Sequence, residues 1–220
     1  LPERLCNLLC SLRPNEEKLA FSAIFEMNDK AEVKKHRIVK TVIKSDRRFT
    51  YEEAQAVIET GEGDYKDEIL KLNELAQILR KNRMAAGAVD FDRVEVRFDI
   101  DEKGRPISVY FKESKEANKL IEEFMLLANR TVAECIGKVP QNKKAKVFPD
   151  RIHDLPDPDK LENLNWFVNR FGYKLRTSGS KAEVSKSLNK LLADIRGKKE
   201  QNLIEMVSLK AMQKAKYSTH

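Results

Sequence analysis

Apolar residues in the first part of the chain follow two different periodicities. Residues 2–12 carry leucines at helical spacing, which predicts a short helix. Residues 18–27 and 33–43 instead alternate apolar and polar side chains around Asn28-Asp29-Lys30, which predicts a β-hairpin. One face of the first strand is expected to carry Leu19, Phe21, Ala23, Phe25 and Met27.

Helical spacing returns after this hairpin. Thr50 precedes a helical run and Glu53 follows three residues later, which is the pattern of a capping box. Glycines at 61 and 63 end that run, and a long helix is expected from about 66 to 86. Strands are expected over 94–100 and 107–111, joined by a turn at 101–104.

The C-terminal part of the chain reads as helical. A strongly apolar helix is expected over 114–136, followed by a proline-rich loop over 137–160. Further helices are expected over 159–171, 181–195 and 198–217. Hairpin strands set apart from helices predict an α+β fold, with antiparallel strands in hairpins packed with several helices.

The distribution of charge says more about function than the overall composition does. The 42 Lys and Arg residues outnumber the 35 Asp and Glu residues, giving a net charge of +7. Residues 174–199 hold eight basic residues and only two acidic ones, and 138–146 is basic without any acid. This pattern is typical of a surface that follows nucleic-acid phosphates. The candidate phosphate contacts are Lys174, Arg176, Lys181 and Lys186. A solvated helix surface is the alternative interpretation.

Familiar catalytic motifs are missing from the sequence. It has no phosphate-binding glycine-rich loop, dinucleotide fingerprint or nucleophile elbow, and no apolar run of about 20 residues that would span a membrane. Cys6 and Cys10 are four residues apart and read as small buried thiols, because no further zinc ligands lie nearby. Asp154, Asp157 and Asp159 could bind Mg²⁺, although a helix-capping role for Asp157 or Asp159 is favoured.

Four phrases of sequence together resemble a known family. They are LPERLCN with LCSLRPNE over residues 1–16, GAVDFD over 87–92, IEEFMLLAN over 121–129, and RIH at 151–153 with Pro156 and Lys160-Leu161. Their order and spacing resemble the catalytic domain of the RNase II superfamily, most closely its bacterial ribonuclease R branch. The resemblance covers nearly the whole chain.

The resemblance implies a processive exonuclease. Such enzymes use Mg²⁺ to hydrolyse single-stranded RNA from its 3′ end to nucleoside 5′-monophosphates, and they are expected in the cytoplasm without a membrane partner. The family's metal-binding aspartates belong to a motif upstream of the phrases found here. Residues 1–220 are therefore expected to be a central segment of the catalytic domain, truncated at both ends. No metal ligand and no catalytic residue is assigned within them, and the isolated segment is expected to be inactive. Flanking oligonucleotide-binding domains are expected in the parent protein.

The resemblance also suggests individual RNA-binding residues. Tyr51 resembles a tyrosine of the RNA channel, and Glu122 resembles a glutamate near the ribose of a bound nucleotide. A carboxylate can accept a hydrogen bond from a 2′-hydroxyl, so this pair is expected to distinguish RNA from DNA. Phe91 resembles a phenylalanine that clamps stacked bases, and Asn129 is a further candidate of the channel. Without the resemblance, Tyr51 and Glu122 read as ordinary helix residues and Phe91 as a core residue.

Two other functions remain open at this point. A non-catalytic RNA-binding module would keep the basic surface and its salt-dependent affinity. A helical scaffold for protein partners would bind no RNA even at low salt. Leu1 at the start and the apparent helix running toward His220 also suggest a piece of a longer protein.

Overall fold

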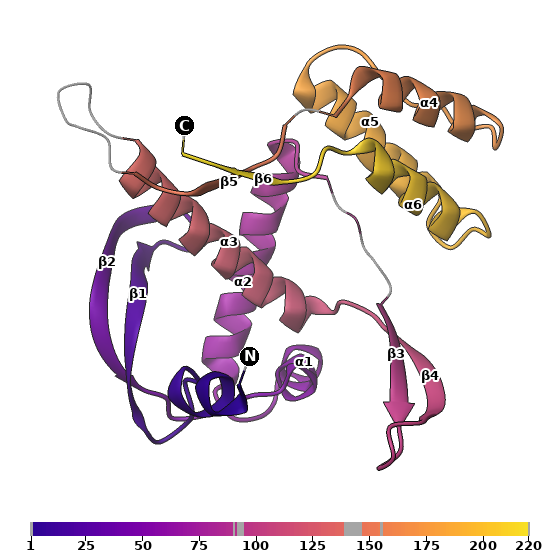
Figure 1. Ribbon diagram of the computed structural model, residues 1–220. Coiled ribbons are helices and arrows are strands. Elements are labelled where there is room, and N and C mark those ends of the chain that lie inside the picture. The colour runs from indigo at the N-terminus through magenta and orange to yellow at the C-terminus, as the bar shows by residue number, and fades with distance from the viewer. Residues whose placement is uncertain (1, 90, 92–94, 139–146, 155, 220) are drawn as a thin grey trace. The chain divides into compact units, whose positions relative to one another are not determined.

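The computed structural model describes residues 2–89, 91, 95–138, 147–154 and 156–219. The chain divides into two compact units, and Figure 1 labels the helices and strands that they contain. Unit 1 comprises residues 1–79 and 115–135, and unit 2 comprises residues 80–114 and 136–220. The α+β expectation is confirmed, because helices combine with three separate antiparallel strand pairs within the described residues.

Unit 1 begins with a single π-helical turn, η1 (Arg4–Leu9), in which the Cys10 amide donates to the Leu5 carbonyl. The expected helix over 2–12 is therefore shorter than predicted. Its leucine stripe is exposed, and so are Cys6 and Cys10, so the interpretation of these two cysteines as buried thiols was wrong. Leucine spacing alone could not show whether another element would cover this stripe.

The predicted hairpin is present as β1 (Glu17–Met27) and β2 (Val33–Lys44). Its turn is held by Asn28, whose side-chain oxygen accepts from the amides of Lys30 and Glu32. The expected apolar face is only partly buried: Phe25 and Met27 are half-buried, whereas Leu19 and Phe21 are 87% and 75% exposed. The inward-facing positions change phase near Ala23, so one face does not run unbroken along β1.

Helix α1 (Tyr51–Thr60) begins with the predicted capping box. The Thr50 hydroxyl accepts from the Glu53 amide at 3.1 Å, and the Glu53 carboxylate accepts from the Thr50 amide at 2.7 Å. Gly61 ends the helix with a φ of 72°, which glycine adopts without a steric penalty. The long helix α2 (Lys66–Ala85) follows, and its last turns belong to unit 2.

Helix α3 (Glu116–Gly137) completes unit 1. The buried Gln55 side chain of α1 accepts a hydrogen bond at 2.9 Å from the Ala117 amide, one of the first amides of α3 that has no partner within its own helix. Gln55 thus joins the two helices, a role that the sequence did not reveal. Within the chain as described, no helix is long and apolar enough to cross a membrane.

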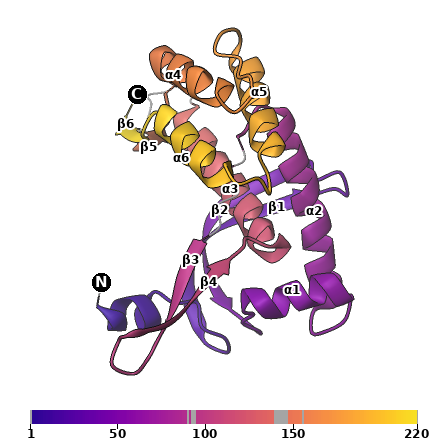
Figure 2. The same ribbon diagram turned by 90° about the vertical axis from the view of Figure 1, so that its right-hand side faces the viewer.

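Unit 2 contains the second predicted hairpin and a group of three helices. The hairpin is β3 (Glu95–Ile100) with β4 (Pro106–Lys112), and Asp101 anchors its turn by accepting from the amides of Lys103 and Arg105. The helices are α4 (Pro158–Asn169), α5 (Lys181–Asp194) and α6 (Gln201–Ala211), which lie together in both views (Figure 2).

The three helices pack around the core of unit 2. All ten residues of this core come from the helices and the segments that join them: Leu161, Leu164, Val168, Leu175, Leu188, Leu191, Leu192, Ile195, Ile204 and Ala211. Asp157 caps α4 by accepting from the Asp159 amide, as favoured from the sequence. Ser180 and Glu183 form a second capping box at the start of α5.

The last strand pair of unit 2 corrects two expectations. β5 (Asp150–Ile152) pairs antiparallel with β6 (Lys216–Ser218), so the 137–160 segment is not loop throughout. The expected helix over 198–217 stops at Ala211, because Met212 already has extended backbone geometry. A partner strand far away in the sequence therefore determines the conformation of residues that have a helix-like pattern of their own.

Candidate nucleic-acid interface

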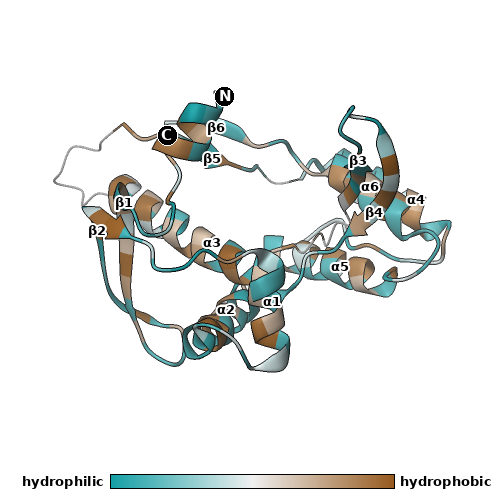
Figure 3. Cartoon of the chain, turned by 90° about the horizontal axis from the view of Figure 1, so that it is seen from below, coloured by the Kyte–Doolittle hydropathy of each residue, from teal (hydrophilic) through white to brown (hydrophobic). Residues whose placement is uncertain are grey.

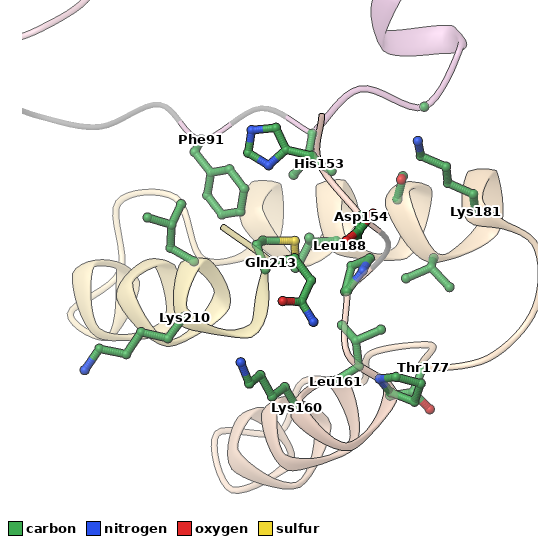
Figure 4. Close-up of a pocket in the computed structure, with 18 of the residues that line it drawn as sticks. Phe91, His153, Asp154, Lys160, Leu161, Thr177, Lys181, Leu188, Lys210 and Gln213 are labelled. Carbon is green, nitrogen blue, oxygen red and sulfur yellow. The ribbon is translucent and has the colours of Figure 1, made fainter. Parts of the chain in front are cut away.

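Unit 2 contains a pocket with a volume of about 1530 Å³ (Figure 4). It is lined by residues that lie far apart in the sequence, from the end of α2 and the segment after it, the loop before α4, the start of α5, and the end of α6 with the tail that follows. Its apolar wall consists of Val89, Phe91, Leu161, Val184, Leu188, Met206, Leu209 and Met212, with Pro156 and Pro158 nearby. Its charged rim consists of Arg83, Asp154, Lys160, Lys181, Lys210, Lys214 and Lys216.

The segment that carries Phe91 is fastened to α5. The Asn189 side chain donates to the Ala88 carbonyl at 2.7 Å. Gly87 has a φ of 96°, and a Cβ at this position would come within 3.7 Å of the Ala182 backbone. Both features bring this segment against α5, and Phe91 packs against the core of unit 2. Phe91 therefore packs against the core and also lines the pocket, while its contact with RNA bases stays a prediction.

The start of α5 is fixed by its capping box. The Glu183 carboxylate accepts from the Ser180 amide at 2.9 Å and pairs with Arg176 at 2.8 Å. The hydrogen bond from the Ser180 amide, together with the Arg176 charge, lowers the pKa of Glu183 below its ordinary value. The same box holds Lys181 at the first position of the helix, where its side chain reaches the pocket.

The pocket has a strong excess of positive charge. Among the residues that the structure describes, six Lys or Arg side chains line it together with a single carboxylate, Asp154. Lys216 already pairs with that carboxylate at 2.6 Å. Among the residues that the structure describes, Lys160, Lys181, Lys210 and Lys214 form no ion pair. The pocket is therefore suited to an anionic ligand.

The predicted phosphate contacts do not all reach this pocket. Lys181 lines it, whereas Lys174 and Lys186 are exposed and lie outside its lining. Arg176 is also outside the lining, and it pairs with Glu183 and donates to the Ser178 carbonyl. The basic run over 138–146 lies almost entirely outside the described residues.

The three remaining RNA-binding candidates belong to unit 1. Tyr51 is the first residue of α1 and is 43% exposed. It lies one helical turn before Gln55, on the side of α1 that Gln55 joins to α3. Glu122 is half-buried on α3, and the exposed Asn129 lies two turns further on the same face. The neighbouring Glu123 is buried, at 3% exposure, and no pattern in the sequence favoured it over Glu122.

The described residues do not support a metal-binding site. They contain no group of three or more His, Cys, Asp or Glu side chains that could hold a metal ion. Asp157 caps α4, and Asp154 pairs with Lys216, so two members of the aspartate cluster have structural partners. These residues do not fit a resident Mg²⁺ ion.

Most of the pocket's cations were missed in the sequence. Arg83, Lys160, Lys210, Lys214 and Lys216 converge only in the folded chain. One local signal was available, because residues 210–216 carry three lysines and no acid. We had predicted that this tail is helical. In the structure it is extended beyond α6, and this conformation brings Lys214 and Lys216 to the pocket.

Comparison with known proteins defines the family. The RNB domain pattern matches residues 1–220, and the chain therefore belongs to the RNB domain family. It is 36% identical over 228 residues to "Ribonuclease R" of Aquifex aeolicus, a match that covers 100% of this chain and 31% of that protein. It is 46% identical over 185 residues to "Exosome complex exonuclease RRP44" of Mus musculus, covering 83% of this chain and 19% of that protein.

Solved structures share the fold. The RNase R of Mycoplasma genitalium, in complex with ribose-methylated single-stranded RNA, matches with a TM-score of 0.84 and 23% identity. That match covers all of this chain and 34% of the solved chain. The yeast pseudonuclease Ssd1 matches with a TM-score of 0.68 and 18% identity, over all of this chain and 26% of that one. The chain thus spans about a third or less of each of these four proteins.

Proposed function

We propose that this chain is a segment of a cytoplasmic, processive 3′-to-5′ exoribonuclease that degrades single-stranded RNA to nucleoside 5′-monophosphates. The observation that carries the proposal is the RNB domain match over residues 1–220, together with 36% identity to a ribonuclease R across the whole chain. The cation-rich pocket with its apolar wall supports it, because RNA offers phosphates and bases to these two surfaces.

In this proposal residues 1–220 bind and orient RNA, and the full-length protein supplies Mg²⁺ binding and oligonucleotide-binding domains from other segments. Tyr51 and Glu122 contact the terminal nucleotide, and Glu122 accepts from its 2′-hydroxyl. Phe91 stacks against a base, and Asn129 contributes hydrogen bonds. The phosphates are contacted by four basic residues, Lys174, Arg176, Lys181 and Lys186.

The test is degradation of 5′-labelled single-stranded RNA by the full-length protein in Mg²⁺, with EDTA as the control. We expect the RNA to shorten from its 3′ end while nucleoside 5′-monophosphates accumulate. RNA binding without monophosphate release would contradict the exonuclease and support the non-catalytic RNA-binding module. The same assay on residues 1–220 alone is expected to give no Mg²⁺-dependent product.

Substitution of Glu122 tests how the sugar is recognised. Glu122→Ala in the full-length protein removes the acceptor for the 2′-hydroxyl, so we expect weaker discrimination between RNA and DNA oligonucleotides of the same sequence. A loss of one such contact corresponds to about a tenfold smaller ratio of the two kcat/KM values. Glu122→Gln keeps an acceptor and should retain most of the preference, whereas unchanged discrimination in Glu122→Ala would remove this residue from the site.

A further inference from the structure

Unit 1 contains a pair of reactive side chains that the proposed function does not use. His36 lies on β2 and Cys135 lies on α3, and the His36 Nε2 atom is 3.1 Å from the Cys135 Sγ atom. We infer that Cys135 is a modification site that reacts with low-molecular-mass disulfides, anionic ones above all, and that His36 is the base for this reaction. The inference does not depend on the proposed function.

Two elements far apart in the sequence bring this pair together. The β1–β2 pairing places His36 opposite Phe25, which is half-buried. Cys135 lies close to the C-terminal end of α3, and this helix lies beside the β1–β2 hairpin (Figure 1). Both residues belong to unit 1, so their contact lies within one compact unit. The pair is therefore a product of the fold, and no local sequence pattern reveals it.

The other cysteines of the chain provide a comparison. Cys135 and His36 are exposed, so a small reagent can approach the sulfur. Cys6 and Cys10 are exposed as well, but neither of their sulfurs has a hydrogen-bond partner within the described part of the chain. Exposure alone predicts that all three cysteines react alike. The contact with His36 predicts that Cys135 reacts first.

The role of His36 follows from the chemistry of thiols. The thiolate is the nucleophile, and most free thiols are protonated at neutral pH. An imidazole nitrogen without a proton, within hydrogen-bond reach of the sulfur, can accept the thiol proton. The thiolate is then formed next to an imidazolium ion, which stabilises it until a reagent arrives.

The reaction with a disulfide balances without a further reagent. The Cys135 sulfur attacks one sulfur of the disulfide, so a new S–S bond forms while the original S–S bond breaks. The second sulfur leaves as a thiolate and takes the proton that His36 held, which returns the imidazole to its neutral form. Cys135 is thereby oxidised to a mixed disulfide, and the other half of the reagent is reduced to a thiol.

The strand that carries the imidazole favours an anionic reagent. Residues 34–40 include four Lys or Arg residues and no acid. Two of these cations pair with acids of the same hairpin, whereas Arg37 and Lys40 form no ion pair with any residue that the structure describes. On α3, the acid next to the thiol, Glu134, is already paired with Arg130 at 3.1 Å. The excess of positive charge attracts an anionic disulfide toward this part of unit 1.

The first test compares the three cysteines in the reduced full-length protein. Oxidised glutathione, an anionic disulfide, is added at pH 7 and low salt, and peptide mass spectrometry follows the mixed disulfide at each site. We expect Cys135 to react about tenfold faster than Cys6 or Cys10. This is less than the roughly hundredfold effect of a general base in an active site, because water reaches the exposed pair. Dithiothreitol should restore the free thiol. Equal or slower reaction of Cys135 would overturn the inference.

Substitution of His36 tests whether the imidazole is the cause. His36→Gln can still hydrogen-bond to the sulfur but cannot take its proton, so the rate at Cys135 should fall about tenfold. The rates at Cys6 and Cys10 should stay unchanged, and circular dichroism verifies that the variant folds. His153→Gln is the matched control, since it makes the same change at an exposed histidine of unit 2. An unchanged rate at Cys135 in folded His36→Gln would remove His36 from the reaction.

A cationic disulfide tests the charge preference. The measured quantity is the ratio of the Cys135 rate to the Cys6 rate, which cancels the intrinsic reactivity of each reagent. We expect this ratio to be several-fold larger with oxidised glutathione than with cystamine, and the difference should shrink at high salt. Equal ratios, or a larger ratio with cystamine, would overturn the preference for an anionic reagent.

Discussion

Two regions of unit 2 have similar apolar side chains and opposite environments. The three-helix group buries its apolar residues almost completely, with Leu164 at 1% exposure and Ile204 at 0%. The β3–β4 hairpin leaves Phe98, Ile107 and Phe111 at 61–71% exposure, and its strands alternate in hydropathy in Figure 3. Three helices can cover one another's apolar stripes, whereas a two-stranded sheet needs another layer to cover it. An apolar pattern therefore identifies an element without showing that the element makes a core.

The largest effect on stability is expected from removing a core side chain. Leu164→Ala should lower the free energy of unfolding by about 2–5 kcal/mol, because a cavity replaces a fully buried side chain. Ile107→Ala in the hairpin should change it by less than about 1 kcal/mol, since that side chain is already in water. Urea unfolding followed by circular dichroism measures both values, and similar losses would mean that the hairpin contributes to the core.

A smaller test asks how far the helical group depends on the start of α5. Ser180→Ala removes the capping hydroxyl, and we expect a loss of about 1 kcal/mol in the free energy of unfolding. Ser178→Ala is the control, because only the backbone carbonyl of that residue has a described hydrogen bond. Equal midpoints of urea unfolding for Ser180→Ala and the native chain would show that the cap does not contribute to the stability of the helical group.

The smallest expected effect is the dependence of this cap on pH. The pKa of Glu183 is lowered chiefly by the bond from the Ser180 amide, so the folded state favours the ionised carboxylate. Such a group contributes stability above its ordinary pKa of 4.5, and this contribution disappears as the pH falls through the lower folded value. The thermal-midpoint difference between the native chain and Glu183→Gln should shrink from pH 7 to pH 3. A difference that stays constant would contradict this account.

Local signals carried most of the predictable structure. The capping box of Thr50 and Glu53, the Asn28 turn and both hairpins depend on residues close together in sequence, and they form as expected. The capping box of Ser180 and Glu183 has the same signature and could have been found by the same rule. The predictions were wrong where a partner distant in sequence determines the conformation. An example is β6, which is a strand because it pairs with β5.

The candidate site was less predictable than the fold for the same reason. Phe91 and Lys181 were identified, but no sequence pattern indicated that one pocket contains both together with Arg83 and Lys210. Helical periodicity also could not show which of Glu122 and Glu123 is the more buried. The two residues are adjacent on α3, yet Glu122 is half-buried and Glu123 is buried. The Tyr51, Glu122 and Asn129 assignments stay predictions.

The pairing of β5 with β6 has a consequence for the order of folding. The other two strand pairs are hairpins that close over short turns, which are fast events. The β5–β6 pair joins chain segments on either side of the whole three-helix group, so its contacts are of high sequence separation and form slowly unless the helices associate first. Asp154 and Lys216 come together at this junction. We therefore expect this contact of the charged rim to form after the helices have associated.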